Sequence, residues 1–218
     1  MRRSAFLLAL AALLLPAAAH AQKLVLTGGG FNVQRRVYLQ NSVLEQTGLW
    51  IGGSGTARLG KLRIGVSGLT GKFKGEAGDP ANTEVKARTT AVTVQLAFTP
   101  ALMVGVQAEG RRFDADAGVT SWRLIGVRAR FEPALGIPGL RGLADVAVLP
   151  ASSVSNGPSI KMALEAAVGV TLAPPRSPLL ARLTYRFERF DIAEEGLAAE
   201  RYEQFRGLTV EVGFRLGR

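Results

Sequence analysis

The stretch Leu-Thr-Val-Glu-Val-Gly-Phe-Arg-Leu at 208–216 decides the fold, because apolar residues alternate strictly with polar residues or glycine. Successive side chains of a β-strand point to opposite sides, so the apolar residues would share one face. The same alternation recurs in 101–113, 158–172 and 178–190. The pattern predicts β-strands with one apolar and one polar face.

Applied along the whole chain, the alternation predicts ten strands. They lie near 23–34, 47–59, 61–74, 84–98, 101–113, 118–132, 139–150, 158–173, 178–191 and 204–216. The alternation is weakest in 23–34 and 139–150, and merging or deleting these two would give eight strands. Short turns such as 60–61 and 99–100 separate some strands. The longer polar connections lie around 35–46, 75–83, 151–157 and 192–203.

The first 21 residues are typical of a secretory signal peptide. Two arginines follow the initiator, an unbroken apolar run covers 5–15, and Ala-His-Ala at 19–21 matches a small-x-small cleavage site. An uncleaved anchor is the alternative, but this apolar run is shorter than the roughly 20 residues that a membrane span needs. We expect the mature chain to begin at Gln22, with 25 basic and 17 acidic residues and a net charge of +8.

Full charges occur in the middle of the predicted strands, on their polar faces. These strands have about 11 to 15 residues, whereas strands of soluble proteins usually have about 5 or 6. In a membrane barrel the apolar face contacts lipid and the polar face lines the lumen. The lumen-lining candidates are Arg63, Glu109, Arg111, Arg128, Arg130, Lys161, Glu165, Arg182, Arg186, Glu188, Glu211 and Arg215. Their mixed signs predict a lumen filled largely by ion pairs.

Aromatic and basic residues gather near the ends of the predicted strands. The aromatic residues are Phe98, Phe131 and Phe214 toward the short turns, and Phe73, Phe113, Trp122 and Phe190 toward the longer connections. We expect them to form two girdles at the bilayer interfaces. Basic residues at the same outer ends are candidates for contacts with lipid phosphates. They are Arg35, Arg36, Lys72, Lys74, Arg112, Arg189, Arg201 and Arg206.

In these features the sequence resembles the small outer-membrane β-barrel proteins of Gram-negative-type bacteria, over all of 22–218. The resemblance rests on the signal peptide, the even strand number, the connection lengths and the final alternating strand. It implies an all-β fold, a closed antiparallel up-and-down transmembrane barrel of about ten strands, located in the outer membrane. It also implies outer-membrane lipid and the outer-membrane assembly machinery as partners. The basic residues at the outer ends make lipopolysaccharide the candidate lipid. Members commonly end on an aromatic residue, whereas here Arg-Leu-Gly-Arg follows Phe214.

The sequence predicts no catalytic, cofactor-binding or metal-binding residues. It has no cysteine, and its one histidine, His20, lies in the predicted signal peptide. The enzymatic members of the superfamily rely on histidine, the usual general base near neutral pH. Glycine clusters at 28–30 and 52–55 are interpreted as features of the barrel wall, and the acid pair Asp114 and Asp116 as a solvated loop. Predicted export argues against nucleic acid as a partner.

We therefore expect a non-enzymatic integral outer-membrane protein with a structural or surface-interaction role. Side chains just fill the interior of a small barrel, which favours a plugged lumen. One alternative is a narrow diffusion pore for ions or small solutes, because glycine and alanine between the charged residues would leave a thin water path. Another is a soluble, secreted, lipocalin-like carrier of an apolar ligand. That carrier would have apolar side chains facing inward.

Overall fold

The computed structural model describes residues 23–39, 42–75, 84–115, 118–155, 159–193 and 201–217. The predicted signal peptide and Asp116 lie outside these residues. Over these same ranges, no helix is long and apolar enough to cross a membrane.

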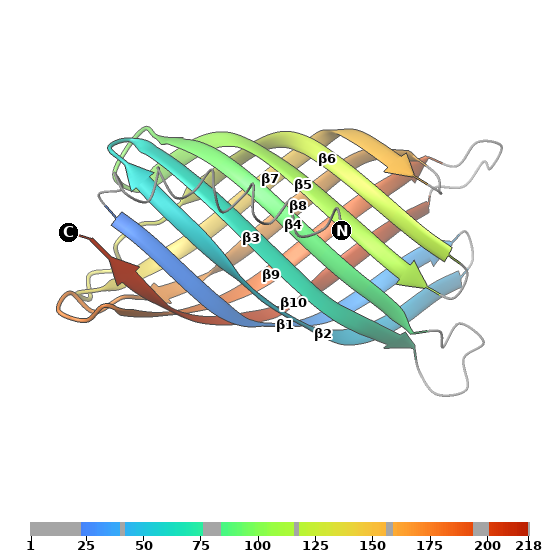
Figure 1. Ribbon diagram of the computed structural model, residues 1–218, viewed down its shortest axis with the longest axis horizontal. Helices are drawn as coiled ribbons and strands as arrows, with labels where there is room; N and C mark the ends of the chain where they lie inside the picture. The colour runs from blue at the N-terminus through green and yellow to red at the C-terminus, as the bar shows by residue number, and fades with distance from the viewer. Residues whose placement is uncertain are drawn as a thin grey trace, which may run out of the picture.

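Ten long antiparallel strands form the described part of the chain, as the alternation predicts (Figure 1). They are β1 (Lys23–Leu39), β2 (Ser42–Leu59), β3 (Leu62–Gly75), β4 (Val85–Ala97), β5 (Leu102–Ala115), β6 (Gly118–Phe131), β7 (Leu140–Ser155), β8 (Ser159–Leu172), β9 (Leu179–Ala193) and β10 (Arg201–Leu216). The two strands with the weakest alternation are complete members of the wall, as β1 and β7. The eight-stranded alternative is therefore wrong.

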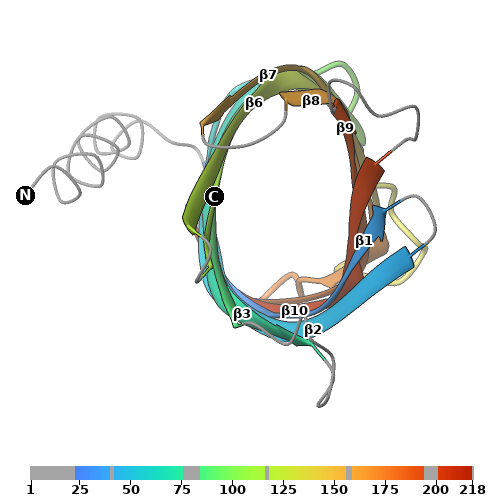
Figure 2. The same cartoon turned by 90° about the vertical axis from the view of Figure 1, so that its right-hand side faces the viewer.

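The wall closes because β1 pairs with β10, while every other strand pairs with its neighbours in the chain. The β1–β10 register runs from Leu24 opposite Leu216 to Tyr38 opposite Tyr202. Figure 2 shows the resulting oval ring, seen along the barrel. Closure gives every strand two partners, which lipid requires because it cannot hydrogen-bond an exposed backbone edge.

The two ends of the barrel differ in their connections. Barrels of this kind have short turns on the periplasmic side and longer connections outside. We call the end with the short turns, which also holds the last residues of β10, the periplasmic end, and the opposite end the outer end (Figure 1).

Several strands extend farther toward the outer end than polarity predicts. The segment 35–46, expected as a connection, contains the end of β1 and the start of β2, where Arg36 lies opposite Glu45. Nη2 of Arg36 is 2.8 Å from Oε1 of Glu45. Parts of 151–157 and 192–203 are likewise strand. Polar residues beyond the lipid-facing belt can pair across strands, so loss of apolar character does not mark the end of a strand.

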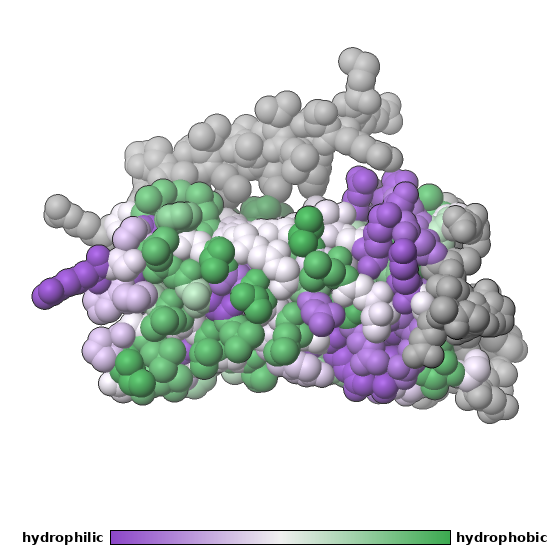
Figure 3. Space-filling model, turned by 90° about the horizontal axis from the view of Figure 1, so that it is seen from below, coloured by the Kyte–Doolittle hydropathy of each residue, from purple (hydrophilic) through white to green (hydrophobic). Residues whose placement is uncertain are grey.

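Apolar side chains cover the outside of the wall over its periplasmic and middle parts. Val212 is 64% exposed, Val127 59% and Val168 58%. Figure 3 shows this green belt, followed toward the outer end by a purple band of hydrophilic residues. Phe98 and Phe131 are exposed on the periplasmic side of the belt, in the positions expected for an aromatic girdle.

Candidate functional site in the barrel lumen

Eleven of the twelve charged lumen candidates lie on the inner side of the wall. They are Arg63, Glu109, Arg111, Arg128, Arg130, Glu165, Arg182, Arg186, Glu188, Glu211 and Arg215. Lys161 is the exception, because its side chain is exposed while Ile160 and Ala163 point inward. Between Ile160 and Met162 the β8–β9 register shifts by one residue. Such a bulge inserts one unpaired residue into the strand. The residues before the bulge then point to the opposite side from the one that a strict period of two predicts.

Aromatic rings fill the outer part of the lumen. This aromatic plug consists of Phe31, Trp50, Phe73, Phe113, Trp122, Phe190 and Phe205. The ring centroids of Trp50 lie 5.9 Å from Phe31 and 5.2 Å from Phe73, and other contacts in the plug span 4.8 to 6.0 Å. The rings come from β1, β2, β3, β5, β6, β9 and β10, so they meet across the barrel axis.

The expectation of an outer aromatic girdle was wrong for Phe73, Phe113, Trp122 and Phe190. All four are buried inside the barrel. That expectation considered only their position along the strand. Their side is fixed by the period of two: Phe73 lies an even number of residues from Arg63 on β3, so both point inward.

Guanidinium groups lie on both sides of the plug. On the outer side, Arg35 donates to Oε2 of Glu203 over 2.8 and 3.0 Å and to Oε1 of Gln46 over 2.7 Å. On the periplasmic side, Cζ of Arg111 lies 4.4 Å from the ring centroid of Phe190. Phe205 is between them, 5.9 Å from Arg35 and 5.5 Å from Arg111. Cations over aromatic faces add cation–π attraction to the packing of the plug.

A buried group of charges lies directly beneath the plug. This central charge cluster consists of Gln107, Glu109, Arg111, Arg128, Asp145, Glu165, Arg186 and Glu188. Arg111 donates to Glu109, to Oε1 of Glu165 over 3.2 Å and to Oε2 of Glu188 over 2.7 Å.

The rest of the central charge cluster links these carboxylates to one another. Nε of Arg128 is 2.7 Å from Oδ1 of Asp145, and Nη2 of Arg186 is 2.8 Å from Oε1 of Glu188. Gln107 donates to both Glu109 and Glu165. Three guanidinium groups thus face four carboxylates. A buried ion pair offsets its desolvation cost only when its remaining hydrogen-bonding groups are also satisfied.

Glycines on β1–β3 make room for the long charged side chains of the facing strands. Gly28 lies opposite Gly53 and Gly29 opposite Gly52 in the β1–β2 register. An added Cβ at Gly52 would collide with the backbone of Gly68 on β3. The glycine clusters therefore belong to the wall, and at Gly29, Gly52 and Gly53 the backbone of a neighbouring strand lies too close for a Cβ.

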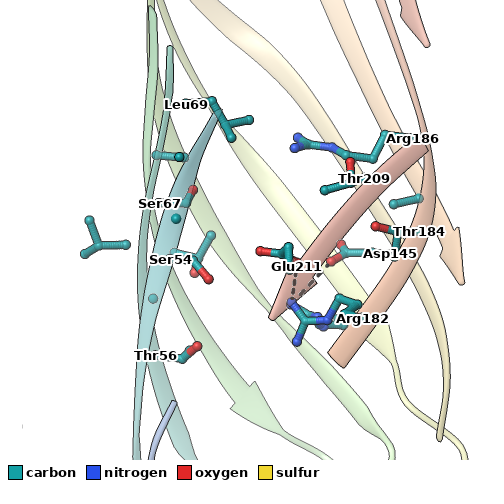
Figure 4. Close-up of a pocket in the computed structure, with 18 of the residues that line it drawn as sticks. Ser54, Thr56, Ser67, Leu69, Asp145, Arg182, Thr184, Arg186, Thr209 and Glu211 are labelled. Atoms are coloured by element: carbon teal, nitrogen blue, oxygen red, sulfur yellow. Dashed lines mark hydrogen bonds and ion pairs between the residues drawn. The ribbon is translucent and has the colours of Figure 1, made fainter. Parts of the chain in front are cut away.

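A polar chamber of about 150 Å³ lies beside these glycines. Figure 4 shows the short side chains of Ser54 and Ser67 on one side, and Arg182 and Arg186 on the other. Nη1 of Arg182 is 3.0 Å from Oε2 of Glu211, on the periplasmic side of this chamber.

Toward the periplasm the lumen opens into a larger cavity of about 460 Å³. We call it the vestibule. Its charged lining residues are Lys23, Arg58, Lys61, Arg63, Glu132, Arg141, Arg182 and Arg215. Nη1 of Arg63 and Nε of Arg130 lie 3.5 and 2.8 Å from Oε1 of Glu132. Burial of Glu132 opposes its ionisation, but Arg130 and Arg63 outweigh this effect and lower its pKa to about 2.

The basic residues expected outside fall into two groups. Arg35 and Arg201 point into the lumen and lie beside Glu203, so they are not available to lipid. The others, Arg36, Lys72, Lys74, Arg112, Arg189 and Arg206, alternate with inward residues and lie on the outer side. Along the strand, they follow the apolar belt toward the outer end.

The outer cations are not uniformly neutralised around the barrel. On β9, β10, β1 and β2 they have partners: Arg189 pairs with Asp191, Arg36 with Glu45, and Arg206 donates to Gln34. On β3–β6, Lys72 lies opposite Lys86 and Arg88 opposite Arg112. Like charges directly opposite one another are unfavourable, so this side attracts counter-ions. Among the described residues, the acids beside them are Glu84, near Lys72 and Lys74, and Asp114, near Arg112.

No protein-family model and no curated protein matches the chain. Among solved structures, outer membrane protease OmpT from Escherichia coli is similar over 90% of this chain and 97% of that chain, with a TM-score of 0.58 and 11% identity. The translocator domain of autotransporter NalP from Neisseria meningitidis covers 88% of each chain, with a TM-score of 0.45 and 12% identity. Ail, the attachment invasion locus protein of Yersinia pestis, has a TM-score of 0.38 and 9% identity, over 90% of this chain and 99% of its own.

At these identities the likeness concerns the fold. The closed ten-stranded wall and its outward apolar belt agree with it. The chain therefore has the fold of a small bacterial outer-membrane β-barrel.

Proposed function

We propose that this protein is a non-enzymatic, non-conducting barrel of the outer membrane, with a structural or surface-interaction role. One observation carries the proposal: the aromatic plug and the central charge cluster fill successive levels of the lumen. Five side chains of the plug, Phe31, Trp50, Phe73, Phe190 and Phe205, are 0 or 1% exposed. A lumen that holds no continuous water path leaves the outer surface and its connections as the parts that meet other molecules.

The residues available for catalysis support a non-enzymatic role. The single histidine of the sequence is His20, in the predicted signal peptide. Across the ranges that the structure describes, no group of three or more His, Cys, Asp or Glu residues could hold a metal ion. The E. coli neighbour is a protease by name, but 11% identity supports a shared fold and no shared chemistry. The carboxylates of the central charge cluster are engaged with arginines.

The outward apolar belt opposes the soluble-carrier alternative. A lipocalin-like carrier would keep its large apolar side chains inside and polar ones outside. Here Val210, Val212 and Phe214 on β10 are all more than half exposed. In water they would form a large apolar patch, whereas lipid accepts them.

The cation-rich outer side of β3–β6 supports lipopolysaccharide as a lipid partner. Lys86, Arg88 and Arg112 point outward beyond the apolar belt, toward the outer end. Arginine and lysine form strong charge-assisted hydrogen bonds with phosphate oxygens. A phosphate between these strands would relieve the repulsion between Arg88 and Arg112.

Co-purification tests the lipid contact. The triple variant Lys86→Glu, Arg88→Glu, Arg112→Glu should carry several-fold less lipopolysaccharide after detergent extraction. The matched control reverses three charges inside the periplasmic mouth, at Arg58, Lys61 and Arg141, and should retain the wild-type amount. Equal retention by both variants would contradict the lipid contact.

Conductance across a planar bilayer tests the closed lumen. We expect purified protein, with its insertion verified by heat-modifiable mobility of the reconstituted sample, to give no discrete current steps. The variant Trp50→Ala should produce steps or leak, because it removes the ring that contacts Phe31 and Phe73. Discrete, reproducible steps from the wild-type protein would instead establish the narrow-pore alternative.

A further inference from the structure

We propose that the vestibule is a binding site, open to the periplasm, for a small oxyanion that carries two or more negative charges. The site is distinct from the closed outer part of the lumen. It is formed by side chains on the inner side of nearly every strand, so the wall separates it from the head groups of the surrounding lipid.

The lining of the vestibule carries far more positive than negative charge. Seven of its lining residues are basic, and Glu132 is the one carboxylate among the described lining residues. Glu132 is already engaged by Arg63 and Arg130, and Arg182 by Glu211. Five cations therefore have no carboxylate within ion-pair distance in the described part of the chain: Lys23, Arg58, Lys61, Arg141 and Arg215.

These cations also have unused hydrogen-bonding capacity. Arg215 donates through Nη2 to the carbonyl oxygens of Pro174 and Ser177, which fixes its side chain at the mouth. Its Nε is buried and has no hydrogen-bond partner among the described residues. Nε of Arg58 donates to the carbonyl oxygen of Gly60. Neutral carbonyls orient these guanidinium groups without cancelling their charge, which suits recognition of an oxyanion.

The volume of the vestibule also suits a small-molecule ligand. Small-molecule sites commonly have volumes of roughly 300 to 1,000 Å³, and the vestibule has about 460 Å³. Its apolar lining includes Met103, Leu180 and Pro175. The cavity is therefore large enough for an organic phosphate or polycarboxylate with a modest apolar part. Low-dielectric walls also focus the positive potential and raise the local concentration of anions.

Calorimetry of the purified protein in an uncharged detergent tests the proposal. Inorganic tripolyphosphate and citrate serve as probes at fixed, low ionic strength, and comparison of the two distinguishes a phosphate from a carboxylate ligand. We expect saturable binding with one site per chain for at least one probe. Absence of saturable binding for both probes would overturn the proposal.

The decisive variant is Arg58→Gln with Arg141→Gln, two exposed side chains at the rim whose loss should leave the fold intact. It should weaken binding about ten-fold, because two charge-assisted contacts are lost. The matched control is Arg189→Gln with Arg206→Gln, the same change of charge on the outer side of the wall. Equal weakening by both pairs would show attraction to net charge alone, and no weakening by the rim pair would place the anion elsewhere; either result rejects the vestibule. Because binding is measured in detergent, this result is independent of whether the lumen conducts.

Discussion

The two halves of the lumen use arginine in opposite ways. In the outer half, Arg111 lies against Glu109, Glu165 and Glu188, below a layer of aromatic rings. In the periplasmic half, Arg58, Arg141 and Arg215 line a water-accessible cavity without carboxylate partners. Buried charges must be paired, whereas charges beside water need not be. The difference indicates a brace in the outer half and a surface for anions in the periplasmic half.

The largest effect is expected at the centre of the brace. Arg111→Met leaves the carboxylates of the central charge cluster with one cation fewer and should destabilise the barrel by about 3–5 kcal/mol. The corresponding vestibule change, Arg141→Met, should alter stability by less than about 0.5 kcal/mol. Urea unfolding in detergent, followed by tryptophan fluorescence, measures both. Similar losses in the two variants would remove the distinction between the halves.

Each residue of the aromatic plug should contribute somewhat less to the free energy of unfolding than Arg111 does. Trp50→Ala creates a cavity among packed rings and should cost about 3 kcal/mol, whereas Trp50→Phe should keep most of the contacts and cost about 1 kcal/mol. The same urea titration, followed here by heat-modifiable mobility, gives the values. An alanine variant as stable as the wild type would mean that the plug is not a packed unit.

Acid should act through Glu132, the carboxylate in the lining of the vestibule. Its pKa is lowered to about 2 in the folded protein, so its ionised form adds stability above its unfolded pKa of about 4.3. This contribution, on the order of 2 kcal/mol, should be lost as the pH falls from about 4 to 2. Unfolding midpoints across this range should fall more steeply for the wild type than for Glu132→Gln. Parallel curves would contradict the ion pairs with Arg63 and Arg130.

The smallest effect is expected on anion binding in the vestibule. Glu132→Gln removes the one carboxylate among the described residues that line the vestibule. It should tighten tripolyphosphate binding about three-fold, through the loss of repulsion. Titration calorimetry at pH 7 measures the change, and heat-modifiable mobility verifies folding. Weaker binding by this variant would show that Glu132 orients the site more than it repels the anion.

Much of the fold could be predicted from the sequence, because lipid requires apolar side chains on one face of each strand and leaves the polar side chains to the other face. Alternation with period two located all ten strands, including the two weakest, and placed eleven of the twelve charged lumen candidates on the inner face. The aromatic plug was also within reach, since Phe73 lies an even number of residues from Arg63 on the same strand. The position of such residues along the strand predicted a girdle. The face of the strand on which their side chains lie shows instead that they fill the lumen.

Other features depend on contacts between distant strands. Lys161 leaves the lumen because β8 and β9 change register at that point, and neither strand alone encodes the bulge. The inward pairing of Arg35 with Glu203 joins residues 168 positions apart. The vestibule likewise needs Lys23, Arg141 and Arg215 on one side of a closed wall, which only the full register provides.

Closure of β1 on β10 also has a consequence for the timing of synthesis. One of the two partners of β1 is β10 (Arg201–Leu216), which is synthesised much later. Until then the nascent chain has unpaired edges and apolar faces that invite aggregation. Loop-closure entropy makes such a distant pairing slow. The barrel therefore cannot close before β10 has been synthesised, and a chain that stops short of β10 would keep open edges on β1 and β9.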